Sequence, residues 1–128
     1  SMARPAHRLG DLQLAIMKVL WSSGPAAVTE VHRALPTASG LAPTTVATML
    51  RKMEDKGLVR HRAEGRKFLY EACVSEGSVS RSMTDHLLDK VFEGNLADLV
   101  CHLLDSRRVS PDELEQIARW IEERKAKP

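Results

Sequence analysis

Aromatic residues are scarce in this sequence, which has two Trp, two Phe and one Tyr among its 128 residues. A core must therefore consist mainly of Leu, Val, Ile, Met and Ala, and a short piece of the chain would struggle to bury enough apolar area alone. Two cysteines, Cys73 and Cys101, are too few for a disulfide framework. No run of about 18 apolar residues is present, and the start has no apolar segment of signal-peptide length. These absences make a cytoplasmic protein, without a membrane-spanning part, the default expectation.

Motifs for catalysis are also absent. There is no Gly-rich phosphate loop and no nucleophile elbow. The acidic pairs Glu54-Asp55 and Glu122-Glu123 are adjacent on predicted helices and are expected to be solvated. An enzyme is thus the weakest interpretation, and no cofactor is predicted.

Charge divides the sequence into two parts. Residues 1–74 contain 11 Lys and Arg against 6 Asp and Glu, a net of +5, whereas residues 75–128 contain 8 against 11, a net of −3. The basic part favours a polyanion, and the acidic part favours another task, such as association with another chain. We expect a domain boundary at 74/75, giving domains 1–74 and 75–128.

Hydrophobic periodicity predicts three helices in the first part, at 9–22, 29–35 and 43–56. Gly24, Pro25 and Pro36 end the first two, while Pro43 and Gly57 suit the first turn and the C′ position of the third. β-prone runs at 58–63 and 67–72 then predict a two-stranded hairpin that turns at Gly65. The second part is helical again, at 78–92, 96–105 and from 111 onward, where Ser110 and Glu113 form a capping box.

The third helix has two unlike faces. Val46, Met49, Leu50 and Met53 form an apolar stripe, and the opposite face is short and polar, then basic. Its members are Thr44, Thr45, Ala47, Thr48, Arg51 and Lys52. Short side chains allow a helix backbone to approach the major groove, where Thr and Ala methyl groups can contact thymine and Arg can bind guanine or phosphate.

A helix-turn-helix followed directly by a hairpin is a winged helix-turn-helix. The hairpin has cations near its tip, Arg62, Arg66 and Lys67, which suit contact with the DNA backbone. The sequence therefore predicts a mainly α fold with a small β-hairpin, in which an N-terminal winged helix-turn-helix precedes a C-terminal three-helix dimerisation domain. A winged helix used only for protein contact is an alternative, but a basic third helix and a basic hairpin favour double-stranded DNA as the partner.

The three C-terminal helices are short, and their unit of about 50 residues has only Phe92 and Trp120 as aromatics. Interleaving with a second copy would cover their apolar faces, whereas packing on each other within a monomer is the alternative. We predict a homodimer, since two-fold symmetry also matches a palindromic DNA site. The predicted dimerisation residues are Leu99, Val100, Leu103, Ile117, Trp120 and Ile121.

A metal- or redox-responsive winged-helix regulator is the alternative function. Its ligands would come from Cys73, Cys101 and the five His residues. Cys101 and His102 are neighbours on a helix and diverge by about 100°, and no Cys-x-x-Cys or His-x-x-x-His spacing occurs. We therefore predict no metal site, and we expect Cys101 to be a buried structural thiol.

Four segments resemble the penicillinase-repressor (BlaI/MecI-type) family of bacterial transcriptional regulators: LGDLQLAIMKVLW, VTEVHRAL, APTTVATMLRKMEDKGLVRHRAEGRKFLYEACVS and LVCHLLD with the following VSPDELEQI. The resemblance covers nearly the whole chain, and its most specific part runs from Thr44 to Leu58 and from Arg66 to Tyr70. It implies a dimeric repressor of palindromic operators with TACA/TGTA half-sites, controlling antibiotic (β-lactam) or stress-response genes.

The resemblance also implies roles for individual residues. Thr44, Thr45, Ala47, Thr48 and Arg51 match the DNA-facing side of the recognition helix. Arg62, Arg66 and Lys67 match the wing, and Thr29 matches a position that contacts the DNA backbone. Ala47 is a departure, because some members carry a longer basic residue there.

Family members are released from DNA by a partner, so the resemblance implies an upstream sensor or protease. In the β-lactam-responsive branch the repressor is cut at an Asn-Phe bond, and this sequence has His102-Leu103 at the matching positions. The copper-responsive branch carries a C-terminal cysteine cluster, which the tail IEERKAKP lacks. The sequence thus predicts neither of these two induction routes.

Overall fold

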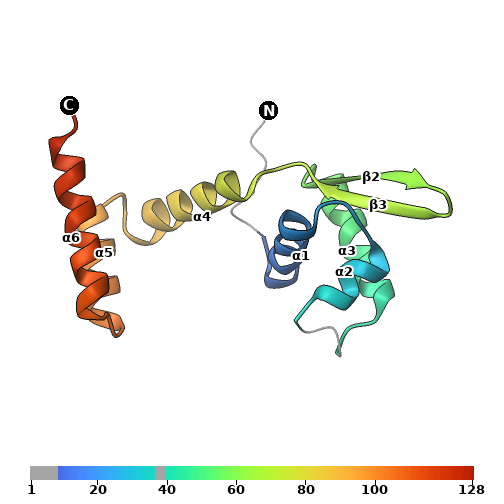
Figure 1. Cartoon of the computed structure of the whole chain (residues 1–128), viewed down its shortest axis with the longest axis horizontal. Coiled ribbons are helices and arrows are strands. Elements are labelled where there is room, and N and C mark those ends of the chain that lie inside the picture. Colours follow the sequence, from blue (N-terminus) through green and yellow to red (C-terminus); the bar gives the residue numbers. More distant parts are fainter. Residues whose placement is uncertain (1–8, 37–39) are drawn as a thin grey trace. The chain divides into compact units, whose positions relative to one another are not determined.

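The computed structural model describes residues 9–36 and 40–128 (Figure 1). Contacts divide the chain into two compact units, Ser1–His86 and Leu87–Pro128, here called the first and second units. The division falls inside helix α4 (Glu76–Val91). Val79, early in α4, is buried in the first unit.

The helix-turn-helix of the first unit begins with α1 (Asp11–Ser23), which buries Ile16 and Leu20 on one face. It ends at Gly24, which has a φ of +76° and donates its N–H to the Leu20 carbonyl at 2.9 Å. Helix α2 (Val28–Ala34) follows, and α3 (Pro43–Asp55) is the third. These bounds confirm the predicted helices to within two residues. The predicted turn residues Thr37, Ala38 and Ser39 lie outside the described residues.

Helix α3 begins with Pro43 in its first turn and ends in a Schellman motif. The N–H of Gly57 donates to the Glu54 carbonyl and the N–H of Leu58 to the Met53 carbonyl, both at 2.9 Å. Gly57 has a φ of +79°, in the left-handed region that a residue with a Cβ rarely adopts. The predicted helix stop at Gly57 is therefore confirmed, and it directs the chain from α3 straight into the hairpin.

The hairpin consists of β2 (Val59–Glu64) and β3 (Lys67–Ala72), joined by a two-residue loop whose Gly65 has a φ of +63°. In Figure 1 the hairpin extends beyond α1, α2 and α3. The predicted hairpin is confirmed, and one further strand was not predicted. A third strand, β1 (Ala26–Ala27), pairs with β3 in an antiparallel sheet of order β1-β3-β2. Two alanines are too short a run to show any hydrophobic periodicity. They become a strand only by pairing with the distant Leu69 and Tyr70.

The core of the first unit is enclosed by α1, α2, α3 and the sheet. Val46, Leu50 and Met53 of α3 are fully buried there, and Tyr70 is the aromatic member. At the edge of this core, the Trp21 indole N–H donates to the carbonyl of Val74 at 2.9 Å and so holds the segment before α4 against α1. Helix α3 is thus anchored by one face only, and its other face stays free for contact.

The second unit contains the end of α4 with α5 (Leu96–Ser106) and α6 (Pro111–Ala126). Both later helices begin with a side-chain cap. Asn95 accepts the Asp98 N–H at 3.0 Å, and the Ser110 hydroxyl accepts the Glu113 N–H at 3.1 Å. These caps satisfy donors that the first turn of a helix leaves unpaired, and the predicted start at Ser110 is confirmed.

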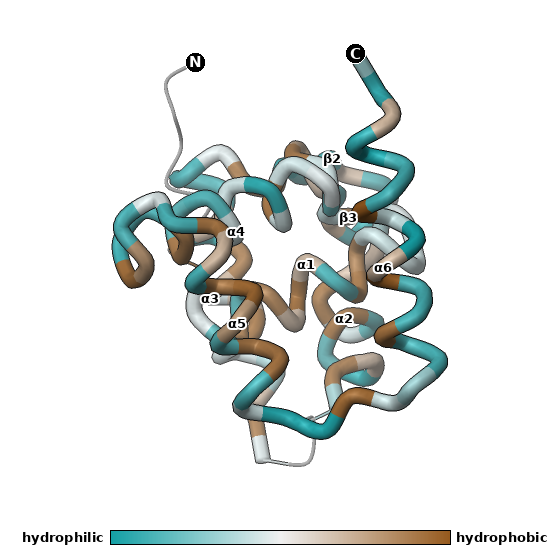
Figure 2. Tube along the Cα trace, turned by 90° about the vertical axis from the view of Figure 1, so that its left-hand side faces the viewer, coloured by the Kyte–Doolittle hydropathy of each residue, from teal (hydrophilic) through white to brown (hydrophobic). Residues whose placement is uncertain are grey.

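Leu99 is the one buried residue of the second unit. Hydrophobic and hydrophilic residues alternate along α5 and α6 (Figure 2), and the hydrophobic ones are largely exposed. The exposed large apolar residues of this unit are Leu87, Val91, Leu96, Val100, Leu103, Leu104, Leu114, Trp120 and Ile121. Cys101 is also exposed, contrary to the expectation of a buried thiol, because α5 has little packed against it in a single chain. Within the described residues, no helix is long and apolar enough to cross a membrane.

Candidate nucleic-acid interface

The exposed face of α3 carries the short polar residues that the sequence predicts for it. Thr44, Thr45 and Thr48 are exposed, Ala47 is half-buried, and Arg51 is exposed one turn after Ala47. The Arg51 guanidinium donates to the Thr48 hydroxyl at 3.3 Å, so the two side chains lie against each other on the helix surface. This face offers hydroxyl groups, methyl groups and the cations Arg51 and Lys52.

Thr29 lies exposed in the first turn of α2. The neighbouring Glu30 carboxylate turns back and accepts the Ala27 N–H at 2.7 Å, which fixes the start of the helix. Further along α2, the His32 ring Nε2 lies 2.6 Å from the Leu41 carbonyl. Because the carbonyl can only accept, Nε2 carries the proton and ties α2 to the segment that enters α3.

The two faces of the hairpin differ in charge. Strand alternation and the pairing register place Arg60, Arg62 and Lys67 on one face, and His61, Phe68 and Tyr70 on the other. The Arg62 guanidinium contacts Glu71 at 3.3 Å and Glu64 at 3.9 Å. Arg60 also contacts Glu71, at 3.5 Å. These exposed ion pairs contribute little stability, but they partly neutralise Arg60 and Arg62.

Arg66 and Lys67, at the hairpin turn, differ from Arg62 in having no carboxylate partner among the described residues. Both are exposed. The turn therefore holds the hairpin's uncompensated positive charge. Since such cations attract phosphate without recognising a base, the turn suits the DNA backbone.

A hollow of about 470 Å³ lies between the exposed face of α3 and the uncharged face of the hairpin. It is lined by Thr48, Arg51, Lys52, Glu54, Asp55, His61, Phe68 and Tyr70. Phe68 is 55% exposed and is the one large exposed apolar side chain among the described residues of the first unit. The exposed face of α3 and this face of the hairpin thus form one continuous surface. Lys52 belongs to the predicted exposed face of α3, whereas His61 and Phe68 were not predicted as part of this surface.

One carboxylate links the two sides of this hollow. Glu54 of α3 accepts the backbone N–H of His61 at 3.2 Å, and its other oxygen lies 2.7 Å from the His61 ring Nδ1. The His61 ring in turn contacts the rings of Phe68, at 4.7 Å between centroids, and Tyr70, at 5.3 Å. The expectation that Glu54 is simply solvated was wrong, because it is half-buried against the hairpin.

Tyr70 closes the inner end of the hollow. Burial raises the pKa of its phenol above the ordinary 10.0, and the negative charge of Glu54 raises it further, while Arg51 lowers it. Tyr70 is therefore a neutral phenol at physiological pH. Its ring forms part of the support beneath the surface rather than a charge upon it.

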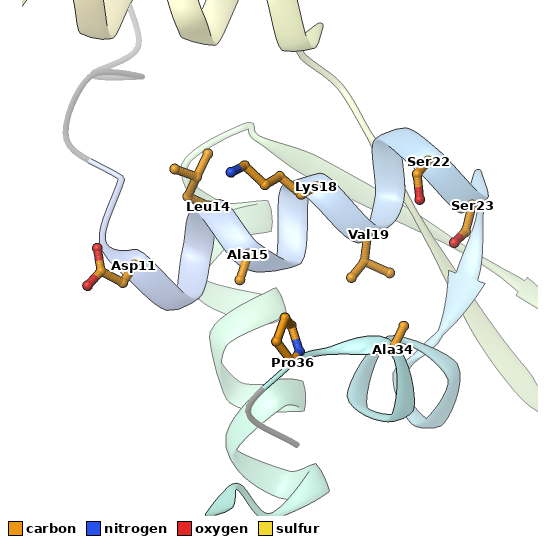
Figure 3. Close-up of a pocket in the computed structure, with 9 residues that line it drawn as sticks. All are labelled: Asp11, Leu14, Ala15, Lys18, Val19, Ser22, Ser23, Ala34 and Pro36. Carbon is orange, nitrogen blue, oxygen red and sulfur yellow. The ribbon is translucent and has the colours of Figure 1, made fainter. Parts of the chain in front are cut away.

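A second pocket, of about 420 Å³, lies between α1 and the end of α2. Figure 3 shows Ala15 and Val19 pointing from α1 toward Ala34 and Pro36, with Lys18 on another side of α1. None of the predicted DNA-contact residues lines this pocket. Its lining has one cation, Lys18, and one carboxylate, Asp11, so it lacks the concentration of positive charge that contact with a polyanion requires.

The described residues contain no group of three or more His, Cys, Asp or Glu side chains that could hold a metal ion. Cys73 and Cys101 are exposed free thiols. They belong to different units, so no single site within either unit contains both.

The arrangement of three helices and a basic, projecting hairpin, with a short-chain polar face on α3, defines a winged helix-turn-helix protein of the DNA-binding class. The sequence agrees with relatives of this class. It matches the Penicillinase repressor family over residues 9–123. The chain therefore belongs to the penicillinase repressor family, which consists of transcriptional repressors and not of enzymes, as the sequence predicts.

Individual relatives cover nearly the whole chain. The transcriptional regulator BlaI of Mycobacterium tuberculosis is 34% identical over 121 residues, covering 93% of this chain and 86% of the relative. The penicillinase repressor of Bacillus licheniformis is 29% identical over 118 residues, covering 92% of each. The solution structure of the DNA-binding domain of the repressor BlaI is 33% identical and covers 59% of this chain and 90% of that domain, with a TM-score of 0.50.

Proposed function

We propose that this protein represses transcription by binding a palindromic operator as a homodimer, with α3 in the major groove and the hairpin on the backbone. The observation that supports this most directly is the structure of α3. Its apolar stripe is buried except for Met49, which is half-buried, while its opposite face presents threonines, an alanine and Arg51 to solvent. An α-helix with this surface can approach base edges closely.

Within this proposal, the residues of α3 have different roles. Thr44, Thr45 and Thr48 contact bases or phosphates through hydroxyl and methyl groups, and Arg51 binds guanine or phosphate. Ala47 is half-buried and short, so it leaves room for a base edge rather than binding one. Specificity then rests on the threonines, on Arg51 and on sequence-dependent DNA shape.

The remaining predicted contacts are to the sugar–phosphate backbone. Thr29 is exposed at the start of α2, and Arg66 and Lys67 present unpaired charge at the hairpin turn. Arg62 contributes less, because its guanidinium contacts Glu71 and Glu64. These residues would orient the protein on DNA without selecting a sequence.

The second unit supplies the dimer contact in this proposal. It buries only Leu99 and leaves apolar side chains on both of its complete helices exposed, with Trp120 at 60%. A second copy related by two-fold symmetry would cover Val100 and Leu103 of α5 together with Ile117, Trp120 and Ile121 of α6. Two recognition helices would then face half-sites about 34–36 Å apart, which is one turn of DNA.

The proposal for the regulated genes rests on the relatives alone. The penicillinase repressor of Bacillus licheniformis supports control of β-lactam-resistance genes as the biological role. An upstream sensor or protease that releases the repressor stays a prediction from the family resemblance. His102 and Leu103, which replace the family's Asn-Phe bond, are both exposed within α5.

Selection of preferred sites from a random DNA pool tests the proposal. The expected result is a palindrome whose half-sites are one turn apart, with affinity that falls steeply as salt rises. The selected duplex should bind more tightly than either a single half-site or a scrambled duplex of equal length. Equal affinity for all three duplexes, or affinity that hardly changes with salt, would rule out specific repression by this surface.

A further inference from the structure

We propose that Glu54 is a positioning residue that fixes the wing, the β2–β3 hairpin, relative to the recognition helix α3 and thereby sets how both reach one stretch of DNA. The proposal rests on the function proposed above, in which α3 and the wing contact DNA together. Glu54 itself need not touch the DNA. It acts through His61 on the opposite side of the hollow.

The geometry of the Glu54–His61 pair is that of a two-point attachment. Both oxygens of one carboxylate are used, one at 3.2 Å from the His61 N–H and one at 2.7 Å from ring Nδ1. An ionised carboxylate only accepts hydrogen bonds, so Nδ1 must carry the proton. Fixing both the backbone and the ring of His61 defines the position of β2 as well as the direction of its side chain.

The attachment extends from β2 to β3. The His61 ring contacts Phe68 and Tyr70, which belong to the neighbouring strand and to the same face of the hairpin. Residues 60–68 are otherwise exposed, whereas Val59 and Tyr70 are buried in the core. Among the described residues, the two bonds to His61 are the hydrogen bonds that join α3 to the strands of the wing.

The negative charge of Glu54 is unfavourable beside DNA, which supports a role in attaching the wing rather than in binding DNA. A carboxylate one turn beyond Arg51, lining the hollow beside the DNA-facing side of α3, repels phosphate. Asp55 is its natural control, because it carries the same charge on the next residue, lines the same hollow and has no side-chain partner among the described residues. Removing either charge lowers the repulsion, but only the loss of Glu54 frees the wing.

Loss of a repulsive charge raises the affinity for DNA, whereas loss of the attachment of the wing lowers it. The two variants therefore distinguish the two roles of the carboxylate. In the full-length protein, Glu54→Ala is expected to weaken binding of the selected duplex by about three- to tenfold, as typical for loss of a coupling contact. Asp55→Ala is expected to leave the affinity unchanged or to raise it. A rise in affinity for both variants would overturn the positioning role and would leave Glu54 as a repulsive surface charge.

A double-mutant cycle separates positioning of the wing from a general structural effect. Arg66→Ala combined with Lys67→Ala removes the wing's backbone contacts, so adding Glu54→Ala to this background should cause little further loss of affinity. A loss as large as in the wild-type background would show that Glu54 acts elsewhere. If Glu54→Ala failed to fold, His61→Ala would replace it, since this change leaves α3 intact and is expected to give the same loss and the same coupling.

Backbone ¹⁵N relaxation of the DNA-free protein gives a readout that does not depend on DNA binding. Glu54→Ala should increase nanosecond motion of residues 60–68, and Asp55→Ala should not. Unchanged motion in Glu54→Ala would overturn the attachment itself. A wild-type protein that binds no selected duplex, yet shows this difference in motion, would refute the proposed function while preserving the attachment of the wing.

Discussion

The first unit buries apolar residues from three helices and three strands in one core, whereas the second unit buries Leu99 alone. All the large exposed apolar residues in the described chain except Phe68 belong to the second unit. The first unit also contains the positively charged wing, while the acidic part of the sequence lies in the C-terminal half. The contrast shows how one short chain can contain a part with a complete core of its own and a part whose apolar side chains stay exposed in a single copy.

The difference has a cause in the sequence. In the first unit, the hairpin and the Schellman turn return the chain onto α1 and α3, so apolar faces meet within one copy. In the second, α5 and α6 are capped and helical but have no sheet to cover them. Local signals define where these helices begin and end, but short helices gain most of their stability from packing, which a single copy supplies only at Leu99.

Leu103→Asp should have the largest effect, because a charge on the α5 surface would occur twice in a two-fold interface. Leu103 is 40% exposed in the single chain. Losing roughly 2 kcal/mol of apolar burial in each copy gives about 4 kcal/mol, or roughly a thousandfold weaker dimer. Sedimentation should show a monomer, and Leu103→Met should remain dimeric. A dimer unaffected by the aspartate would place Leu103 outside the interface.

Leu50→Ala tests whether the core of the first unit is independent of the second unit. Leu50 is fully buried in the core, so the cavity should cost about 2–5 kcal/mol of first-unit stability. Fluorescence of Trp21 in a Trp120→Phe background would follow unfolding of the first unit alone. Sedimentation of Leu50→Ala with Trp120 unchanged should still show a dimer, and Leu104→Ala, on the exposed side of α5, should leave the Trp21 transition unchanged. Loss of the dimer together with the core would show that the two units do not fold independently.

Most of the fold could be predicted, because its helices carry local signals. The caps at Ser110 and Gly57 and the hairpin turn at Gly65 each follow from one or two residues. Strand β1 could not be predicted, because Ala26 and Ala27 become a strand only by pairing with β3. The exposure of Cys101 was also missed, since periodicity identifies an apolar face but not whether the same chain covers it.

The site was only partly predictable for a similar reason. The exposed face of α3 follows from helical spacing around Val46 and Leu50. The Glu54–His61 pair depends on the angle at which the chain leaves α3, and a carboxylate next to Asp55 gives no sign of it in the sequence. Alternation along the hairpin, with His61 and Phe68 on one face, was the signal that could have indicated the hollow.

The proposed DNA contacts of the first unit can be distinguished by whether they depend on the DNA sequence. Arg66→Ala should weaken binding to all duplexes by about fivefold and reduce the salt slope by about one, because it removes a phosphate contact. Thr48→Ala should instead change the preferred base at one position of the selected site. Arg62→Ala is the control, since its guanidinium is already paired with Glu71, and its salt slope should change less. Equal loss without altered preference in Thr48→Ala would make Thr48 a phosphate contact.

The smallest expected effect concerns Tyr70, where burial and then Glu54 raise the phenol pKa and Arg51 opposes them. Because the folded state disfavours the phenolate, this contribution to stability is complete below pH 10.0 and is lost as the pH rises through the folded pKa. Tyr70 is the single tyrosine of the chain, so phenolate absorbance reports it alone. The midpoint should lie above 10.0 in the native protein and return to 10.0 in urea, and Tyr70→Phe should lessen the alkaline loss of stability. A native midpoint at the ordinary value would mean that the first unit leaves this phenol in water, and its core would then be less complete than the contrast with the second unit requires.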